Sequence, residues 1–194
     1  MGTHITKTCS SAFYYLYNIR HIRKCLSRES NEKLVHAFIS SRLDYYNSLL
    51  YGISEYQTRK LQRVMNASAR LIYRAHKFCH VTPLLAELHW LPVRSRIHCK
   101  ILLITFKILH SLSPKYLSDL ISIQQPWSYN LRRSDNGHLL ERPSAKTEKT
   151  MGDRAFQVAF PFLCNKLPRS EATNLQSFKT LIKTFLFKES FQLS

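Results

Sequence analysis

The chain has 194 residues, a formal net charge of +17 and a sequence pI near 10.0. Its length allows one domain with its own core or two small ones, and a 44% hydrophobic fraction excludes disorder throughout. A folded, broadly basic chain favours a polyanionic partner, nucleic acid ahead of a membrane surface. The simpler alternative is a basic protein without such a partner.

The residues that the chain lacks disfavour several classes of enzyme. Its four Asp residues are Asp44, Asp119, Asp135 and Asp153. No two are neighbours, whereas metal-dependent hydrolases and nucleotidyl transferases need clustered carboxylates. Four glycines could hardly build a phosphate-binding loop. We therefore expect no intrinsic enzyme activity and no cofactor.

Cysteine and histidine usage bears on compartment and metal binding. The five cysteines are scattered with no secretory signal ahead of them, which favours reduced thiols in the cytosol or nucleus. The most apolar run, residues 101–106, is far shorter than the ~20 residues of a membrane span. His76, Cys79 and His80 suggest metal ligands, but a closed zinc site needs a further ligand at recognisable spacing. We predict a cytoplasmic or nuclear protein with neither a transmembrane segment nor a metal site.

Residues 3–25 carry apolar side chains at three- and four-residue steps, which predicts a first helix. Tyr14 or Tyr15 could stack on a nucleobase, although aromatic side chains on helices more often contact a core or a partner. Three cations occupy the last turn, namely Arg20, Arg23 and Lys24. Cations there complement the helix dipole, which by itself accounts for them.

Residues 27–30 form a break, and a second helix is predicted to follow to about Tyr51 with Gly52 as its C-terminal cap. The third predicted helix spans residues 54–77, and Ser54 with Gln57 has the form of a capping box. Because short turns join these three helices, we expect them to pack as antiparallel neighbours.

The third helix has one apolar and one basic face. At about 100° per residue, five cations fall within a ~60° arc: Arg59, Arg63, Arg70, Arg74 and Lys77. Six residues point to the opposite side: Leu61, Val64, Met65, Ser68, Leu71 and Ile72. We predict that the apolar face packs on a core and that the cations contact nucleic-acid phosphates.

The next predicted helix is short, opening at Thr82-Pro83 and ending at His89. The helix that follows, residues 93–112, is apolar almost all round, which indicates the buried centre of the domain. Its narrow polar strip consists of Arg96, Lys100 and Lys107, a second set of candidate phosphate contacts.

Ser113-Pro114 begins another short helix, to about residue 121. Residues 122–150 are polar and predict a loop or short hairpin. Residues 151–165 return to a helical pattern interrupted by Pro161, and a last helix is predicted over 174–189. We predict a mainly α fold, an irregular bundle of six to eight helices, with a thumb-like bundle at 1–121 and a C-terminal segment at 122–194.

Several runs of residues resemble jockey-type LINE (non-LTR) retrotransposon reverse transcriptases. They are LVHAFISSRLDYYNSLLYG (34–52), LQRVMNASARLI (61–72), TPLLAELHWLPVR (82–94), FKILH (106–110), PKYLSDL (114–120) and GDRAF (152–156). Their order and approximate spacing match the family over essentially the whole chain. The chain departs from the pattern at Tyr46, where the family has Cys, at Cys164, where it has Trp, and in a shortened stretch before residue 175.

The resemblance implies the thumb-like and C-terminal part of an enzyme for RNA-directed DNA synthesis. The Tyr-x-Asp-Asp motif of that enzyme's palm is absent from this chain. We therefore expect a truncated fragment that is not catalytic alone, binds template–primer or element RNA, and has the palm domain as its intramolecular partner. The alternatives are a protein-interaction module and a non-functional remnant of a mobile element.

Overall fold

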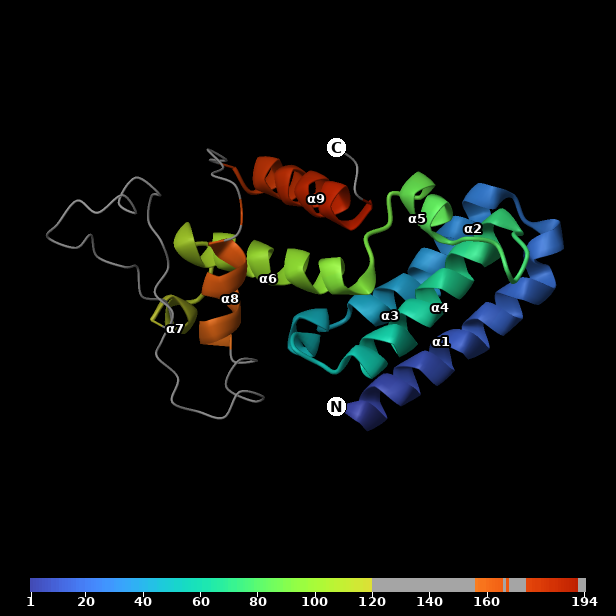
Figure 1. Cartoon of the computed structure of the whole chain (residues 1–194), viewed down its shortest axis with the longest axis horizontal. Helices are drawn as coiled ribbons and strands as arrows, with labels where there is room; N and C mark the ends of the chain where they lie inside the picture. The colour runs from blue at the N-terminus through green and yellow to red at the C-terminus, as the bar shows by residue number, and fades with distance from the viewer. Residues whose placement is uncertain (120–155, 166, 168–173, 192–194) are drawn as a thin grey trace, which may run out of the picture. The chain divides into compact units, whose positions relative to one another are not determined.

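The computed structural model describes residues 1–119, 156–165, 167 and 174–191, and these residues are mainly α-helical with no strand among them (Figure 1). The mainly α prediction is confirmed. The predicted loop or hairpin near 122–150 lies outside the described residues. The chain divides into two compact units, one made of Met1–Ile97 with Phe185–Ser194 and the other of His98–Thr184. The predicted domain boundary between residues 121 and 122 stays a prediction.

The first helix forms as its periodicity predicts. In α1 (Gly2–Ile22) the buried side chains follow three- and four-residue steps: Ile5, Cys9, Ala12, Leu16 and Ile19. A 3₁₀ turn, Arg23–Cys25 (η1), completes the predicted span. Helix α2 (Arg28–Val35) begins directly after Ser27, whose hydroxyl accepts a hydrogen bond from the Ser30 backbone amide at 3.2 Å. The break is therefore Leu26 and Ser27, and the predicted break at 27–30 extended too far into α2.

The predicted second helix to Tyr51 is wrong in its second half. A π-helical turn (η2, His36–Ser40) leads to a short α3 (Ser41–Asp44), where the α-helix stops. Tyr46 then adopts a left-handed backbone conformation at φ 50°, and a 3₁₀ turn (η3, Asn47–Leu50) follows. Gly52, with φ 69°, comes after this turn and does not cap an α-helix.

Helix α4 (Glu55–Tyr73) packs beside α1 as the central element of the first unit (Figure 1). All six predicted core residues of this helix are buried. The backbone carbonyl of Ser54 accepts hydrogen bonds from the amides of Gln57 and Thr58, but the Ser54 side chain makes no capping bond, so the predicted capping box is not formed. The helix begins where predicted and ends four residues early, at Tyr73.

Helix α5 (Thr82–Glu87) has Pro83 in its first turn, and α6 (Val93–Leu109) and α7 (Lys115–Ser118) follow. Burial of α6 is extensive, but the predicted span to Leu112 is too long because Ser111 has a left-handed φ of 55°. Leu112 is accordingly 61% exposed.

Two helices complete the described chain, α8 (Phe156–Cys164) and α9 (Leu175–Phe191). Helix α8 continues through Pro161 instead of being interrupted there, and the Asn165 amide donates to the Pro161 carbonyl at 3.0 Å. Within the second unit, Phe178 of α9 stacks on Phe106 of α6 with 4.2 Å between ring centroids. The predicted last helix is confirmed.

Candidate nucleic-acid interface

The predicted row of five cations on α4 is not a continuous helical face. Arg74 follows the last helical residue in a left-handed conformation at φ 53°, and the Ala75 amide donates to the Arg70 carbonyl at 2.9 Å. This hydrogen bond closes the helix end in the manner of a Schellman motif. Lys77 therefore lies in the turn after α4. The helical spacing that put it in the predicted arc does not apply there.

Two of the four arginines in the predicted row donate hydrogen bonds to backbone carbonyls. Arg70 donates from Nη2 and Nε to the Cys79 carbonyl, at 3.0 and 3.3 Å, and fixes the loop after α4. Arg74 donates from Nη2 to the carbonyls of Arg23 and Leu26, at 3.0 and 3.3 Å. A carbonyl cancels no charge, so both side chains stay cationic while they position the chain.

The other members of the predicted row differ in what surrounds them. Arg59 Nε lies 3.4 Å from Glu55 Oε1, and Arg94 Nη2 lies 3.3 Å from Glu55 Oε2. Glu55 therefore compensates the charge at the N-terminal end of α4. Arg63 and Lys77 are exposed, and neither has a carboxylate partner among the described residues.

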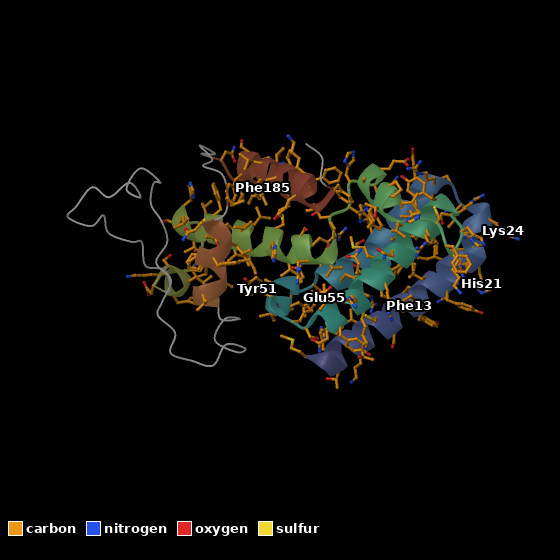
Figure 2. The ribbon with its side chains drawn as sticks, viewed as in Figure 1. Phe13, His21, Lys24, Tyr51, Glu55 and Phe185 are labelled. Carbon is orange, nitrogen blue, oxygen red and sulfur yellow. The ribbon has the colours of Figure 1, made fainter. Side chains whose placement is uncertain are left out.

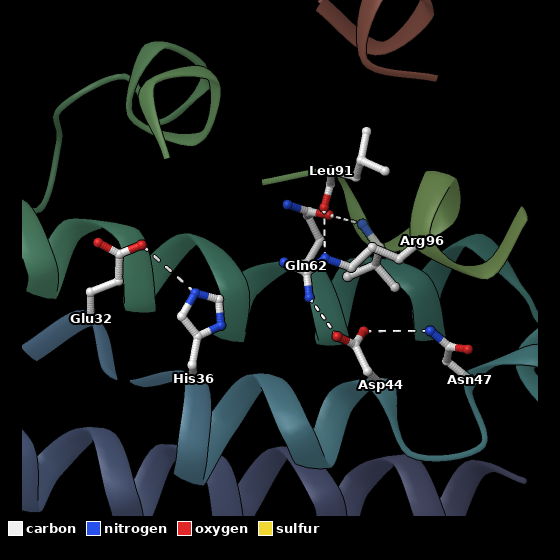
Figure 3. A network of polar contacts seen from close by, with 8 residues as sticks. Glu32, His36, Asp44, Asn47, Gln62, Leu91 and Arg96 are labelled. Atoms are coloured by element: carbon white, nitrogen blue, oxygen red, sulfur yellow. Dashed lines mark hydrogen bonds and ion pairs between the residues drawn. The ribbon is translucent and has the colours of Figure 1, made fainter. Parts of the chain in front are cut away.

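Arg96 is a structural clamp and not a free cation of the second predicted strip (Figure 3). Its Nη1 atom lies 2.8 Å from Asp44 Oδ2, its Nε donates to the Leu91 carbonyl at 3.0 Å, and its side chain is only 16% exposed. The prediction missed this because Asp44 and Arg96 are 52 residues apart. Lys100 and Lys107 are exposed on the part of α6 in the second unit.

Helices α1 and α4 run parallel, so their C-terminal ends meet. At the other end, a Cβ built on Gly2 would lie 3.2 Å from Gln57 Nε2. This arrangement follows from two consecutive antiparallel connections, as predicted. It brings together six cations that we call the basic end: Arg20, Arg23, Lys24, Arg70, Arg74 and Lys77. Figure 2 shows Lys24 in this region, beside His21.

The charge of the basic end exceeds what its helix dipoles require. A helix C-terminus is equivalent to roughly half a negative charge, so two of them amount to about one. The segments that meet here, 20–36 and 70–87, contain eight Lys and Arg residues and three Glu. Dipole compensation, which accounts for the last turn of α1 taken alone, leaves most of this excess unexplained. Only the pairing of the two segments reveals it.

One cation beside the basic end is neutralised locally. Arg28 donates to the Tyr73 hydroxyl, lies over that ring at 4.1 Å from its centroid, and places Nη2 2.9 Å from Glu87 Oε1. Desolvation, followed by the hydrogen bond with Glu87, raises the pKa of Tyr73 to about 12. Hydrogen bonds with Tyr73 and then Arg28 lower the pKa of Glu87. This network joins α2, α4 and α5 and leaves Arg28 out of the free positive charge.

A groove of about 360 Å³ in the first unit lies beside α4, α5 and the start of α6. Among the described residues that line it, Glu55 is the sole carboxylate, and it is paired with Arg59 and Arg94. Gln62 also lines it, donates to Asn66 at 2.9 Å and accepts from the Val93 amide at 2.9 Å. These amide contacts join α4 to the start of α6.

Two of the three candidate metal ligands, His76 and Cys79, make local hydrogen bonds with their side chains. The Phe78 amide donates to His76 Nδ1 at 3.4 Å, and the Cys79 thiol donates to the His80 carbonyl at 3.5 Å. Within the described part of the chain, no three His, Cys, Asp or Glu side chains are grouped so that they could hold a metal ion. Nor does any described helix combine the length and apolar character that crossing a membrane requires.

Comparison of the chain with protein-family models, with curated proteins and with solved structures finds no match in any of the three. The resemblance to reverse transcriptases therefore stays a prediction from the sequence. The basic end, with its six clustered cations, is the feature of the first unit that bears on function.

Proposed function

We propose that the first unit binds nucleic acid through phosphate contacts at the basic end. The observation that carries the proposal is the pair of hydrogen bonds from Arg74 to the Arg23 and Leu26 carbonyls. They join two basic segments that lie about 50 residues apart in the chain. A cluster of cations with few carboxylates attracts a polyanion and binds it without regard to sequence.

The cations of the basic end have two different roles in this proposal. Arg70 and Arg74 position the loop and the end of α1 through their carbonyl contacts. Arg20, Lys24 and Lys77 are exposed and make the phosphate contacts. Arg63 extends the contact surface along α4, and Lys100 with Lys107 provides a separate one on the second unit.

This activity fits the part that the sequence resemblance implies. A thumb-like segment of a reverse transcriptase grips template–primer or element RNA and leaves catalysis to the palm. We propose that role for the chain, with binding and no catalysis of its own. Phosphate contacts would serve RNA and DNA alike, since they carry no base information.

The test is a fluorescence-anisotropy titration of the chain against labelled RNA and duplex DNA at several salt concentrations. Each phosphate contact adds roughly −0.7 to −0.9 to the slope of log affinity against log salt. The double variant Lys24→Glu/Lys77→Glu should weaken binding and make the slope shallower by roughly 1.4 to 1.8. Neither side chain holds a structural hydrogen bond among the described residues, so the fold should be retained.

The matched control is Lys179→Glu/Lys183→Glu, which changes the net charge equally on exposed positions of α9 in the second unit. It should leave affinity and slope nearly unchanged. If both double variants lost affinity equally, the loss would come from the overall charge of the chain and not from the basic end, which would contradict the proposal. If an acidic protein is the true partner instead, excess RNA will not displace it, and that outcome would also contradict the proposal.

A further inference from the structure

The outward face of α1 carries a row of aromatic rings. Opposite the buried stripe, at about 100° of rotation per residue, lie Tyr14, Tyr17 and His21, with Phe13 at the edge of the same face. We call these four residues the aromatic stripe. Figure 2 shows Phe13, His21 and Lys24 following one another toward the C-terminal end of α1.

The rings of the aromatic stripe are more exposed than that of Tyr15, the remaining aromatic residue in this part of α1. Tyr14 is 64% exposed, Tyr17 62% and Phe13 45%. Tyr15, by contrast, stacks on Phe38 with 5.3 Å between centroids, and the Arg42 guanidinium lies 4.5 Å from the centroid of its ring. Tyr15 is therefore used within the fold. Tyr14 meets the Tyr15 ring edge to face at 5.7 Å and Tyr17 meets His21 at 4.5 Å, but both tyrosines stay more than half exposed.

The charge around the aromatic stripe is of one sign. Residues 1–28 contain no Asp or Glu. Lys7 precedes Tyr14 by two helical turns, and Arg20 and Lys24 follow Tyr17 by one and two turns. The last two belong to the basic end, so the stripe and the basic end form one continuous surface along α1.

The spacing of the rings suits bases that are no longer paired. The rings of Tyr17 and His21 meet edge to face with 4.5 Å between centroids, and a rise of ~1.5 Å per residue separates the Cα atoms of Tyr14 and Tyr17 by about 4.5 Å along the axis. Tyr14 and the Tyr17–His21 pair are therefore presented at separate positions along α1, where unpaired bases of an opened strand can meet them. In a duplex the bases are stacked inside and do not present their faces.

We propose that the aromatic stripe stacks the bases of a single-stranded nucleic acid whose phosphates contact the basic end. The inference rests on the proposed function and adds a preference to it: single strands are bound more tightly than duplexes of equal charge. Combining a positive track with exposed aromatic rings is how sequence-tolerant single-strand binders obtain their affinity.

An anionic membrane surface is the rival partner for a basic helix with aromatic residues. The residues between the rings argue against it. Outward positions of α1 also include Thr6, Ser10 and Asn18, which are polar and exposed. A face of this composition buries little aliphatic surface, whereas stacking needs only the flat rings. The observations therefore favour a single strand.

The experiment compares Tyr14→Ala/Tyr17→Ala with the wild-type chain on three probes. These are an oligothymidine of about 12 nucleotides, which is a typical site size, an abasic strand with the same number of phosphates, and a duplex of that length. Alanine is the best helix former, so α1 should be retained, as circular dichroism would verify. We expect a loss of about tenfold or more on oligothymidine, an unchanged salt slope, and no loss on the abasic strand. Tyr14→Phe/Tyr17→Phe should restore the affinity, because it keeps the rings.

The matched control is Tyr56→Ala/Tyr116→Ala, because both residues are 66% exposed and neither lies on α1. It should leave all three affinities unchanged. Equal binding of oligothymidine and abasic strand by the wild-type chain would overturn the stacking inference while leaving the proposed function intact. If Lys24→Glu/Lys77→Glu bound all three probes as tightly as the wild-type chain does, the proposed function would be refuted instead. Tyrosine-dependent binding to phosphatidylserine vesicles, with none to oligothymidine, would assign the stripe to a membrane.

Discussion

The Arg74 guanidinium lies 3.0 Å from the Arg23 carbonyl oxygen and binds the end of α4 to the end of α1. A second bond from the same nitrogen reaches the Leu26 carbonyl at 3.3 Å. Both carbonyls belong to the turn that follows α1, in which the Leu26 amide also donates to the Arg23 carbonyl at 3.3 Å. Arg74 therefore fixes the turn after α1 from a different part of the chain.

Replacing Arg74 should lower stability, whereas replacing Arg63 should not. Arg74→Met removes hydrogen bonds from a charged donor at an exposed site and should cost about 1 kcal/mol. Arg63→Met removes the same charge from an exposed side chain that makes no hydrogen bond or ion pair with the described residues, and should change stability by less than about 0.5 kcal/mol. Urea denaturation of both variants measures the difference. Equal effects would mean that the Arg74 contacts do not contribute.

The Arg96–Asp44 pair should show measurable coupling, and the Arg59–Glu55 pair should not. The Arg96 side chain is 16% exposed, which limits solvent screening, whereas Arg59 is 71% exposed. A double-mutant cycle with Arg96→Met and Asp44→Asn should give about 1 kcal/mol of coupling. The corresponding cycle with Arg59→Met and Glu55→Gln should give roughly 0.3 kcal/mol or less. A larger coupling energy for Arg59–Glu55 than for Arg96–Asp44 would contradict the structural role assigned to Arg96.

Ionisation of Tyr73 should destabilise the fold in alkaline solution. Its pKa is raised from 10 to about 12, first by desolvation and then by the hydrogen bond with Glu87. The folded state therefore favours the neutral phenol, and this contribution is complete below pH 10 and lost as pH rises from about 10 to about 12. In Tyr73→Phe, the decline of stability across this interval should be smaller than in the wild-type chain. A spectrophotometric titration of the folded wild-type chain should show one tyrosine that ionises well above pH 10. If no such tyrosine is seen, the raised pKa of Tyr73 is disproved.

Glu87 should make a contribution of the opposite pH dependence. Its pKa is lowered from 4.5 by the hydrogen bond with Tyr73 and then by that with Arg28. Stability from this carboxylate is present above pH 4.5 and is lost as pH falls through the folded-state value. In Glu87→Gln, the free energy of unfolding should fall less steeply as pH is lowered below 4.5 than it does in the wild-type chain. Urea denaturation at several pH values measures this. Glu29→Gln is the control for removing one carboxylate, since no described residue forms an ion pair with Glu29.

The periodicity of apolar residues was enough to predict those helices whose buried side chains repeat at regular steps along the whole helix. The starts of α4 and α9, and the core residues of α4, agree with the predictions because an amphipathic stripe needs only one apolar surface to pack on. The helix predicted to Tyr51 failed where a long-range contact intervenes. Asp44 binds Arg96 and accepts from Asn47 Nδ2 at 3.4 Å, and this polar corner stands where α3 ends (Figure 3).

For the basic surface, the sequence by itself determined the sign and amount of charge and the helix that carries much of it. Tertiary structure decided which cations are free. Arg70, Arg74 and Arg96 lie within reach of carbonyls or a carboxylate that are remote in sequence, so helical spacing could not reveal their partners. It also decided that α1 and α4 end together. Lys24 and Lys77 thereby belong to one surface, because a local pattern fixes a residue's face but only packing fixes its neighbours.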